Sequence, residues 1–178
     1  DPVDEIYNPN EGVALQDGQE PGFFRYTDAD GDGEITPDDR MFIGNPNPDF
    51  TYGLNLVLGY KGFDLTAFFY GSQVNDIFNY NRWWIDFWPS FQGQKSTDLL
   101  YNSWTPTNTD ATVPKATQAS NLSTNTVSNS YYIEDGSFFR LKNLQIGYTF
   151  DQAVLGNVFS SARIYLQGTN LFTITGYS

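Results

Sequence analysis

Ten residues, Thr51 to Tyr60, alternate strictly between large apolar side chains and small or polar ones. Tyr or Leu stands at every even-numbered position from Tyr52 onward, and Thr, Gly, Asn and Val share the odd-numbered positions. Because successive side chains of a β-strand point to opposite faces, this period of two predicts a strand with one apolar face. Strands of soluble proteins usually have about five or six residues, so the predicted strand is unusually long.

The same pattern recurs in three other segments. Lys61-Gly62 predicts a two-residue hairpin turn, with Gly supplying a positive φ, and leads into a return strand over 63–72. A third strand begins near Ser137, and a short connection over 151–161 leads to a fourth. The sequence therefore predicts four long antiparallel strands.

The connection between the second and third strands, residues 73–136, has no sustained period, and a segment of that length is either functional or disordered. A tilted strand crosses a membrane in about 9–11 residues, and outer-membrane barrels combine short periplasmic turns with long extracellular loops. We therefore expect an all-β fold: a fragment of a transmembrane antiparallel β-barrel with about four long strands and long extracellular loops.

Arg140 and Lys142 interrupt the apolar alternation of the third strand, which resumes cleanly with Leu144, Ile146 and Tyr148. This interruption predicts either a β-bulge at the two basic residues or a rise of that part of the strand above the membrane.

Four strands cannot close a membrane barrel, and an open sheet edge in lipid leaves backbone groups without hydrogen bonds. We therefore expect the chain to be part of a longer polypeptide. Within it, residues 1–50 are expected to form an extracellular region with a metal-binding loop at 28–39. Residues 51–178 are expected to supply the barrel strands and the long extracellular loop 73–136. A soluble antiparallel β-sandwich is the alternative fold, since its strands also alternate.

Composition excludes several classes of function. Nine basic and 21 acidic residues give a net charge of −12, which argues against binding to nucleic acid. The chain has neither His nor Cys, so imidazole and thiolate chemistry are closed to it. No catalytic pair of carboxylates stands out, and we expect no enzymatic activity.

Residues 28–39 read as a twelve-residue calcium loop. Gly33 stands at position 6, where the chain must turn sharply, and Ile35 at position 8 is expected to anchor the loop. Glu34 would offer its backbone carbonyl, and Thr36 would bind directly or through water. The predicted ligands at positions 1, 3, 5, 7, 9 and 12 are Asp28, Asp30, Asp32, Glu34, Thr36 and Asp39.

Two features distinguish this loop from a calcium sensor. Position 12 is Asp39 rather than the longer bidentate Glu, and Pro or Gly residues stand where flanking helices would begin and end. We therefore expect a structural Ca²⁺ that stiffens an extracellular loop. The alternative is an Asp/Gly turn without metal.

The long loop carries a dense aromatic cluster. Its rings could stack on a sugar or bind a partner protein, or they could form a small core that holds the loop together. The candidate contact residues are Trp83, Trp84, Phe87 and Trp88.

An ordered set of segments resembles the SusC/RagA-type TonB-dependent transporters of Bacteroidetes outer membranes. The resemblance spans nearly the whole chain from about Gly22 onward, and the set is more specific than any one member. The segments are Asp30-Gly31-Asp32-Gly33, Asp39-Arg40, Ile43-Gly44-Asn45-Pro46, Pro48-Asp49-Phe50-Thr51-Tyr52-Gly53, Tyr60-Lys61-Gly62-Phe63-Asp64-Leu65, Asn75-Asp76-Ile77-Phe78-Asn79, Trp104-Thr105-Pro106, Phe139-Arg140-Leu141-Lys142-Asn143-Leu144 and Asn170-Leu171-Phe172-Thr173.

The resemblance implies a large plugged barrel in the outer membrane that imports oligosaccharides or peptides. It implies a SusD-like surface lipoprotein as lid, and TonB as energy source through a plug region absent from this chain. No substrate-contact residue carries over from the family. The competing interpretation from the residues alone is a secreted, calcium-stabilised β-sandwich module that binds glycans.

Overall fold

The computed structural model describes residues 3–6, 15–152, 156 and 159–177. They divide into two compact units. The first unit contains the described residues of 1–44 together with 78–134, and the second contains those of 45–77 and 135–178. None of the helices among the described residues is long and apolar enough to cross a membrane.

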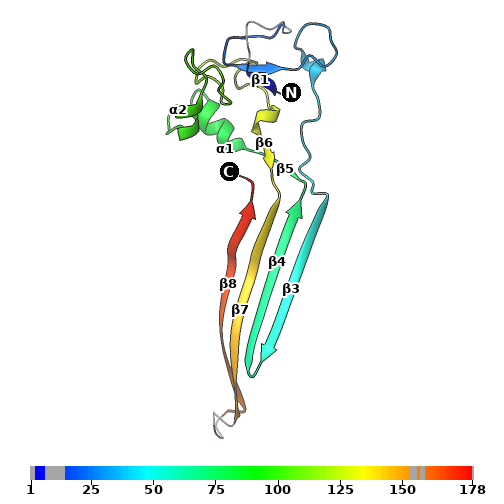
Figure 1. Cartoon of the computed structure of the whole chain (residues 1–178), viewed down its shortest axis with the longest axis vertical. Helices are drawn as coiled ribbons and strands as arrows, with labels where there is room; N and C mark the ends of the chain where they lie inside the picture. Colours follow the sequence, from blue (N-terminus) through cyan, green and yellow to red (C-terminus); the bar gives the residue numbers. More distant parts are fainter. Residues whose placement is uncertain (1–2, 7–14, 153–155, 157–158, 178) are drawn as a thin grey trace. The chain divides into compact units, whose positions relative to one another are not determined.

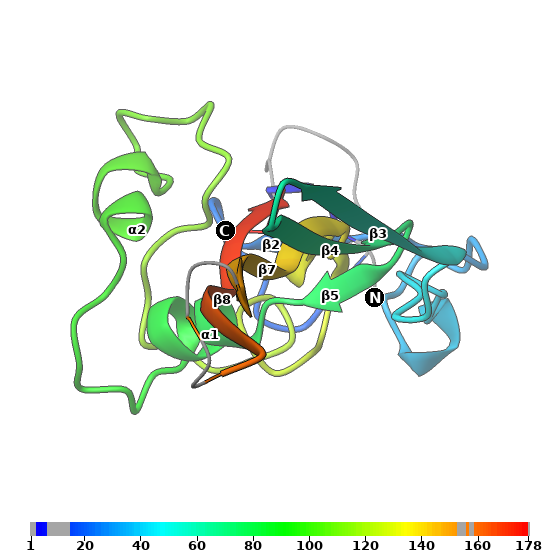
Figure 2. The same ribbon diagram turned by 90° about the horizontal axis from the view of Figure 1, so that it is seen from below.

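The second unit is built on a four-stranded antiparallel sheet with the strand order β3-β4-β7-β8 (Figures 1 and 2). Its strands have 11, 11, 14 and 15 residues, so all four predicted strands are present and long. They span β3 (Phe50–Tyr60), β4 (Phe63–Gln73), β7 (Phe138–Asp151) and β8 (Ser161–Thr175). The predicted connection over 151–161 lies partly outside the described residues.

Lys61-Gly62 forms the expected two-residue turn between β3 and β4. Both residues have positive φ, 45° at Lys61 and 84° at Gly62, as a type I′ turn requires. Tyr60 therefore pairs directly with Phe63, and the two strands stay in uninterrupted register up to Phe50 and Gln73.

Lys142 is the extra residue of a β-bulge in β7, which is one of the two alternatives that the sequence leaves open. Leu141 pairs with Phe69 and Asn143 with Phe68, so Lys142 has no opposite residue on β4. The pairing between β7 and β8 shifts at the same place. The extra residue changes the phase of the alternation, which keeps Leu141 and Leu144 on one face of the sheet.

The first unit has a small aromatic core rather than a long sheet. Phe24 and Tyr132 are almost completely buried, and rings from three separate segments pack edge to face around them. The buried cluster consists of Phe24, Tyr26, Ile35, Phe87, Leu99, Val113 and Tyr132. The long segment 73–136 is therefore mostly folded, and its described residues from 78 to 134 share a core with the N-terminal region.

The short elements surround this core. They are β1 (Val3–Ile6), which pairs with β2 (Phe24–Tyr26), the 3₁₀ turns η1 (Pro37–Asp39) and η3 (Ser130–Tyr132), α1 (Tyr80–Arg82), the π-helical turn η2 (Trp83–Phe87) and α2 (Thr97–Asn102). The three-residue strands β5 (Asp76–Phe78) and β6 (Ile133–Asp135) pair where the chain passes between units. The amide of Asn79 donates to the carbonyl of Tyr132 at 2.7 Å, which closes the loop inside the first unit.

This division differs from the expected one, which placed a boundary at residue 50 and assigned the whole loop 73–136 to the barrel region. The physical reason is long-range pairing between the loop and the N-terminal region. The Gln16 side chain donates to Ser123 Oγ at 2.7 Å, and Tyr26 donates to the carbonyl of Leu122 at 3.0 Å. Such contacts leave no periodic signal in the sequence.

Candidate functional site

The four-stranded sheet has two chemically different faces. Cross-strand partners on one face are apolar throughout: Leu58 pairs with Leu65, Leu65 with Ile146, and Ile146 with Leu166. Most of these side chains are exposed, including Leu166 at 78%. Exposed apolar side chains in contiguous rows mark a surface that faces lipid or a partner.

The opposite face carries hydrogen-bonded polar side chains. Gln167 donates to Asn143 Oδ1 at 2.7 Å, and Arg140 Nε donates to Thr173 Oγ1 at 2.8 Å. The sheet is therefore apolar on one face only.

Asp64 and Arg163 form a bidentate ion pair on the polar face, although β4 and β8 are not neighbours. Arg163 Nε and a terminal nitrogen donate to the two Asp64 oxygens at 3.0 and 2.6 Å. The pair crosses over Gly147 of the intervening strand, where an added Cβ would lie only 2.6 Å from Asp64 Oδ1. The close approach of the two charged side chains therefore requires a glycine at this position.

The predicted calcium loop brings three of its six candidate ligands together. Carboxylate oxygens of Asp28, Asp30 and Asp32 lie within 4.8 Å of one another. The Asp28 carboxylate also accepts hydrogen bonds from the amides of Gly31 and Gly33, at 2.7 and 2.9 Å. These bonds, with φ of 89° at Gly33, fold the loop around its acidic side chains.

Repulsion within the cluster affects its titration. The backbone hydrogen bond from Asp32 lowers the pKa of Asp30, but desolvation and repulsion from Asp32, Asp39 and Asp28 outweigh it, so the pKa is raised. A divalent cation would offset this repulsion.

Asp39 and Thr36 have a different arrangement from the three clustered carboxylates. Asp39 is fully buried, and its oxygens accept from the amides of Ala29 and Thr36 at 2.8 and 2.6 Å. Thr36 Oγ1 accepts from the amide of Asp38, completing a capping box around η1. The hydrogen bond from Thr36 is the main cause of a lowered pKa at Asp39. Glu34 is exposed, and the structure does not include its carboxylate in the cluster.

Ile35 anchors the loop as expected. Its side chain lies in the core cluster of the first unit, while its amide donates to the carbonyl of Leu15 at 2.7 Å. The amide of Leu15 donates in turn to the carbonyl of Gly33 at 2.9 Å. The loop is therefore fixed at its centre by one apolar contact and a short parallel bridge.

The four candidate aromatic residues separate into two pairs. Phe87 is buried in the core, and Trp83 packs against that core while its Nε1–H donates to the carbonyl of Asn125 at 3.0 Å. Trp84 and Trp88 instead stack on each other at 5.5 Å with an angle of 11° between the rings. The first pair fits the structural interpretation, and the second is available for contact.

Sequence reasoning missed Tyr80 as a member of this stack. Its ring lies 6.4 Å from that of Trp84 at an interplanar angle of 19°, and it is 57% exposed. We call Tyr80, Trp84 and Trp88 the ring ladder. The spacing of four residues between successive rings would have revealed it if a helix had been expected.

No protein-family model matches the chain. It is 40% identical over 169 residues to TonB-dependent receptor P3 of Formosa agariphila, covering 94% of this chain and 16% of that receptor. It is 27% identical over 154 residues to the TonB-dependent receptor SusC of Bacteroides thetaiotaomicron, covering 85% of this chain and 14% of SusC. The chain thus spans about one sixth of the length of P3.

The chain is also similar to solved structures of an importer. The RagAB peptide importer in its closed-closed state matches with a TM-score of 0.70 and 28% identity, covering 88% of this chain and 18% of that chain. Its open-open state matches with a TM-score of 0.68 and 27% identity, covering 89% and 18%. The names of these relatives describe receptors and importers rather than enzymes. Sequence and structure together identify the chain as a SusC/RagA-like fragment, similar to one part of these TonB-dependent receptors.

Proposed function

We propose that this chain forms part of the barrel wall of an outer-membrane TonB-dependent transporter. The observation that carries the proposal is the pair of faces on the β3-β4-β7-β8 sheet. Its exposed apolar face fits contact with lipid, and its hydrogen-bonded polar face fits a lumen. Strands of 11 to 15 residues are long enough to cross the membrane at a tilt.

The orientation follows from the lengths of the connections. The two-residue turn at Lys61-Gly62 fits the periplasmic side, and the folded segment 78–134 fits the outside. In this arrangement the first unit meets the substrate and a SusD-like lipoprotein, and TonB supplies the energy. The substrate class is oligosaccharide or peptide, and the likeness to a peptide importer supports the latter.

The ring ladder is the surface that we assign to substrate or lipoprotein contact. The turn that carries Trp84 is tied to Ser96, whose amide and hydroxyl donate to the Asp86 carboxylate at 2.8 and 2.7 Å. The π-helical turn that carries Trp84 is a rare conformation that often occurs at functional sites. Trp84→Ala should weaken uptake or complex formation more than barrel assembly. This difference would distinguish a role of Trp84 in contact from a role in folding.

We also propose that loop 28–39 binds a structural Ca²⁺. The clustered oxygens of Asp28, Asp30 and Asp32 are ligands of the kind that Ca²⁺ prefers, and the raised pKa of Asp30 reflects desolvation together with their repulsion. Glu34 through its carbonyl, Thr36 and Asp39 complete the proposed set.

Calcium binding is testable with terbium luminescence on the whole receptor. Asp30→Asn should weaken the signal strongly, while Asp38→Asn, an exposed carboxylate outside the cluster, should leave it unchanged. Equal signals from both variants would show that the loop is a turn without metal.

The barrel itself is tested by heat-modifiable gel mobility. The receptor that carries this chain is purified from outer membranes in detergent and run with and without boiling. A closed barrel migrates differently before boiling, whereas a single unshifted band would contradict the proposal. The alternative of a glycan-binding β-sandwich has little support. In the described part of the chain, the other two sheets have only two short strands each.

A further inference from the structure

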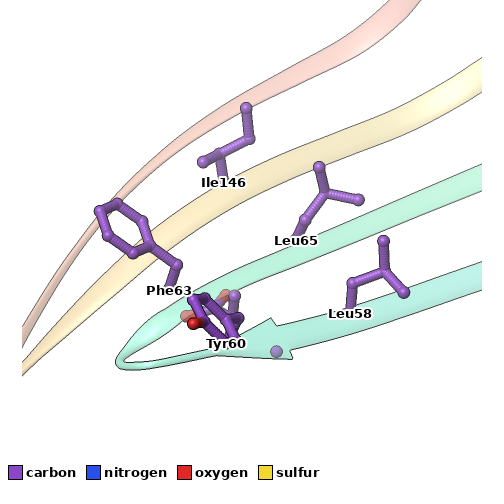
Figure 3. Close-up of a pocket in the computed structure, with 7 residues that line it drawn as sticks. Leu58, Tyr60, Phe63, Leu65 and Ile146 are labelled. Carbon is purple, nitrogen blue, oxygen red and sulfur yellow. The ribbon is translucent and has the colours of Figure 1, made fainter.

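Two grooves lie on the apolar face of the sheet near the Lys61-Gly62 turn. A ridge formed by Phe63 and Ile146, which line both grooves, separates them. The first groove, about 400 Å³, is lined mainly by Leu58, Tyr60, Phe63, Leu65 and Ile146. Figure 3 shows the side chains of Leu58, Leu65 and Ile146 rising from three adjacent strands on the same side. A second groove, about 270 Å³, shares Phe63 and Ile146 and continues over Tyr148, Ile164 and Leu166.

Both grooves are apolar, and one ridge separates them. Phe63 and Tyr148 reinforce that ridge, since their rings lie 4.5 Å apart. The lining of both grooves is mostly apolar, so hydrocarbon fits them better than a polar ligand body does. Paired hydrocarbon chains suit this shape.

A cation stands where the first groove meets the turn. Lys61 Nζ lies 5.3 Å from the centroid of the Tyr60 ring, and Tyr60 is one of the residues that line the groove. Asp64 also lines the first groove, but its carboxylate is paired with Arg163 on the opposite face of the sheet. An ammonium group at the end of an apolar groove is complementary to a phosphate joined to acyl chains.

We propose that this surface binds one anionic diacyl phospholipid. Its acyl chains lie in the two grooves on either side of the Phe63–Ile146 ridge, and its phosphate lies at Lys61. The inference rests on the proposed function, which places the face in lipid and the turn at the periplasmic leaflet. Unlike general contact with lipid, this binding requires an anionic headgroup, the Lys61 cation and two acyl chains.

The test uses native mass spectrometry of the delipidated whole receptor, titrated with phosphatidylglycerol, phosphatidylcholine of the same chains, or lyso-phosphatidylglycerol. The wild type should bind phosphatidylglycerol about fivefold more tightly than phosphatidylcholine, since one Lys near a membrane surface gives a preference of that order. Lys61→Gln should abolish this preference without affecting phosphatidylcholine. Leu58→Trp, which fills the first groove, should weaken binding of both diacyl lipids.

Lys142→Gln is the matched control, because Lys142 lies at the bulge with its ammonium over Tyr70 and away from the grooves. It should retain the lipid preference. A preference that survives in Lys61→Gln, or lyso-lipid that binds as tightly as diacyl lipid, would overturn the proposal. The same preparation is checked for heat-modifiable mobility. A receptor that shifts on boiling but binds all lipids alike refutes the lipid site alone, and one that does not shift refutes the barrel as well.

Discussion

Position 147 has room only for a hydrogen atom in place of a side chain. In Gly147→Ala the new Cβ would meet Asp64 Oδ1 at 2.6 Å and an Arg163 nitrogen at 2.7 Å, so the ion pair must move. We expect a lower temperature for loss of the heat-modifiable band. Gly59→Ala is the control, because its nearest heavy atom would be at 3.8 Å. Equal thermal shifts in the two variants would show that the ion pair contributes nothing measurable.

Asp39 predicts a pH dependence for the order of loop 28–39. Its pKa is lowered in the folded state, mainly because the Thr36 amide donates to it. The stabilising contribution is therefore complete above the ordinary Asp pKa of about 3.9 and is lost as the pH falls through the lower folded-state value. Hydrogen exchange at Ala29 and Thr36, corrected for its intrinsic pH dependence, should accelerate below about pH 4. In Asp39→Asn this contribution is missing, and both amides should already exchange faster at neutral pH.

At the scale of elements, the bulge in β7 sets which face each residue occupies. Deleting Lys142 would move Phe139 and Leu141 to the polar face or force β7 out of register. We expect almost no heat-modifiable receptor in the outer membrane from this deletion. Lys142→Gln keeps the residue count and should assemble normally, and assembly of the deletion at wild-type levels would contradict the role of the bulge.

The two faces of β3 make opposite predictions for the same substitution. Leu56→Arg places a charge in the middle of the apolar face, which costs about 2–4 kcal/mol near the bilayer midplane. Asn55→Arg places the same charge on the polar face and should cost far less. The yield of assembled receptor compares them, and similar yields would show that the apolar face does not meet lipid.

Much of the sheet could be predicted because the alternation of side chains within each strand reflects the environments of its two faces. Alternation gave β3 and β4 within a residue of their ends, and the interruption at Lys142 indicated the bulge as one of two alternatives. The helical turns between residues 80 and 102 could not be predicted in this way. Their order depends on distant partners, as when Asn125 donates to the carbonyl of Phe87 at 2.9 Å.

The candidate sites show the same limit. Spacing within residues 28–39 correctly indicated that Asp28, Asp30 and Asp32 converge and that Ile35 is an anchor. It did not indicate that Thr36 and Asp39 form a capping box, because the same residue types suit both roles. In the aromatic cluster, composition could not tell the buried Phe87 from the stacked Trp84.

At the scale of the whole molecule, the two units have separate sources of stability. The first unit depends on an aromatic core, and the second on sheet pairing. Phe87→Ala removes a buried ring and should destabilise the first unit by about 3–5 kcal/mol. Limited proteolysis should then cleave within 78–134 while the heat-modifiable band persists.

Trp84→Ala is the control for that experiment, since Trp84 is 39% exposed and lies outside the core. Its digestion pattern should match that of the wild type. Simultaneous loss of the barrel band in Phe87→Ala would mean that the two units fold as one cooperative body.

The hydrogen bond between Asn79 and Tyr132 has a consequence for the order of folding. Pairing of β4 with β7 must close the intervening residues 74–137, and the entropic cost of such a closure rises with the length of the free chain. Once the first unit has folded, the two ends of that segment are already held together at Asn79 and Tyr132. The strands then meet as though joined by a short connection, so the kinetic barrier to completing this part of the sheet should be set by the folding of the loop.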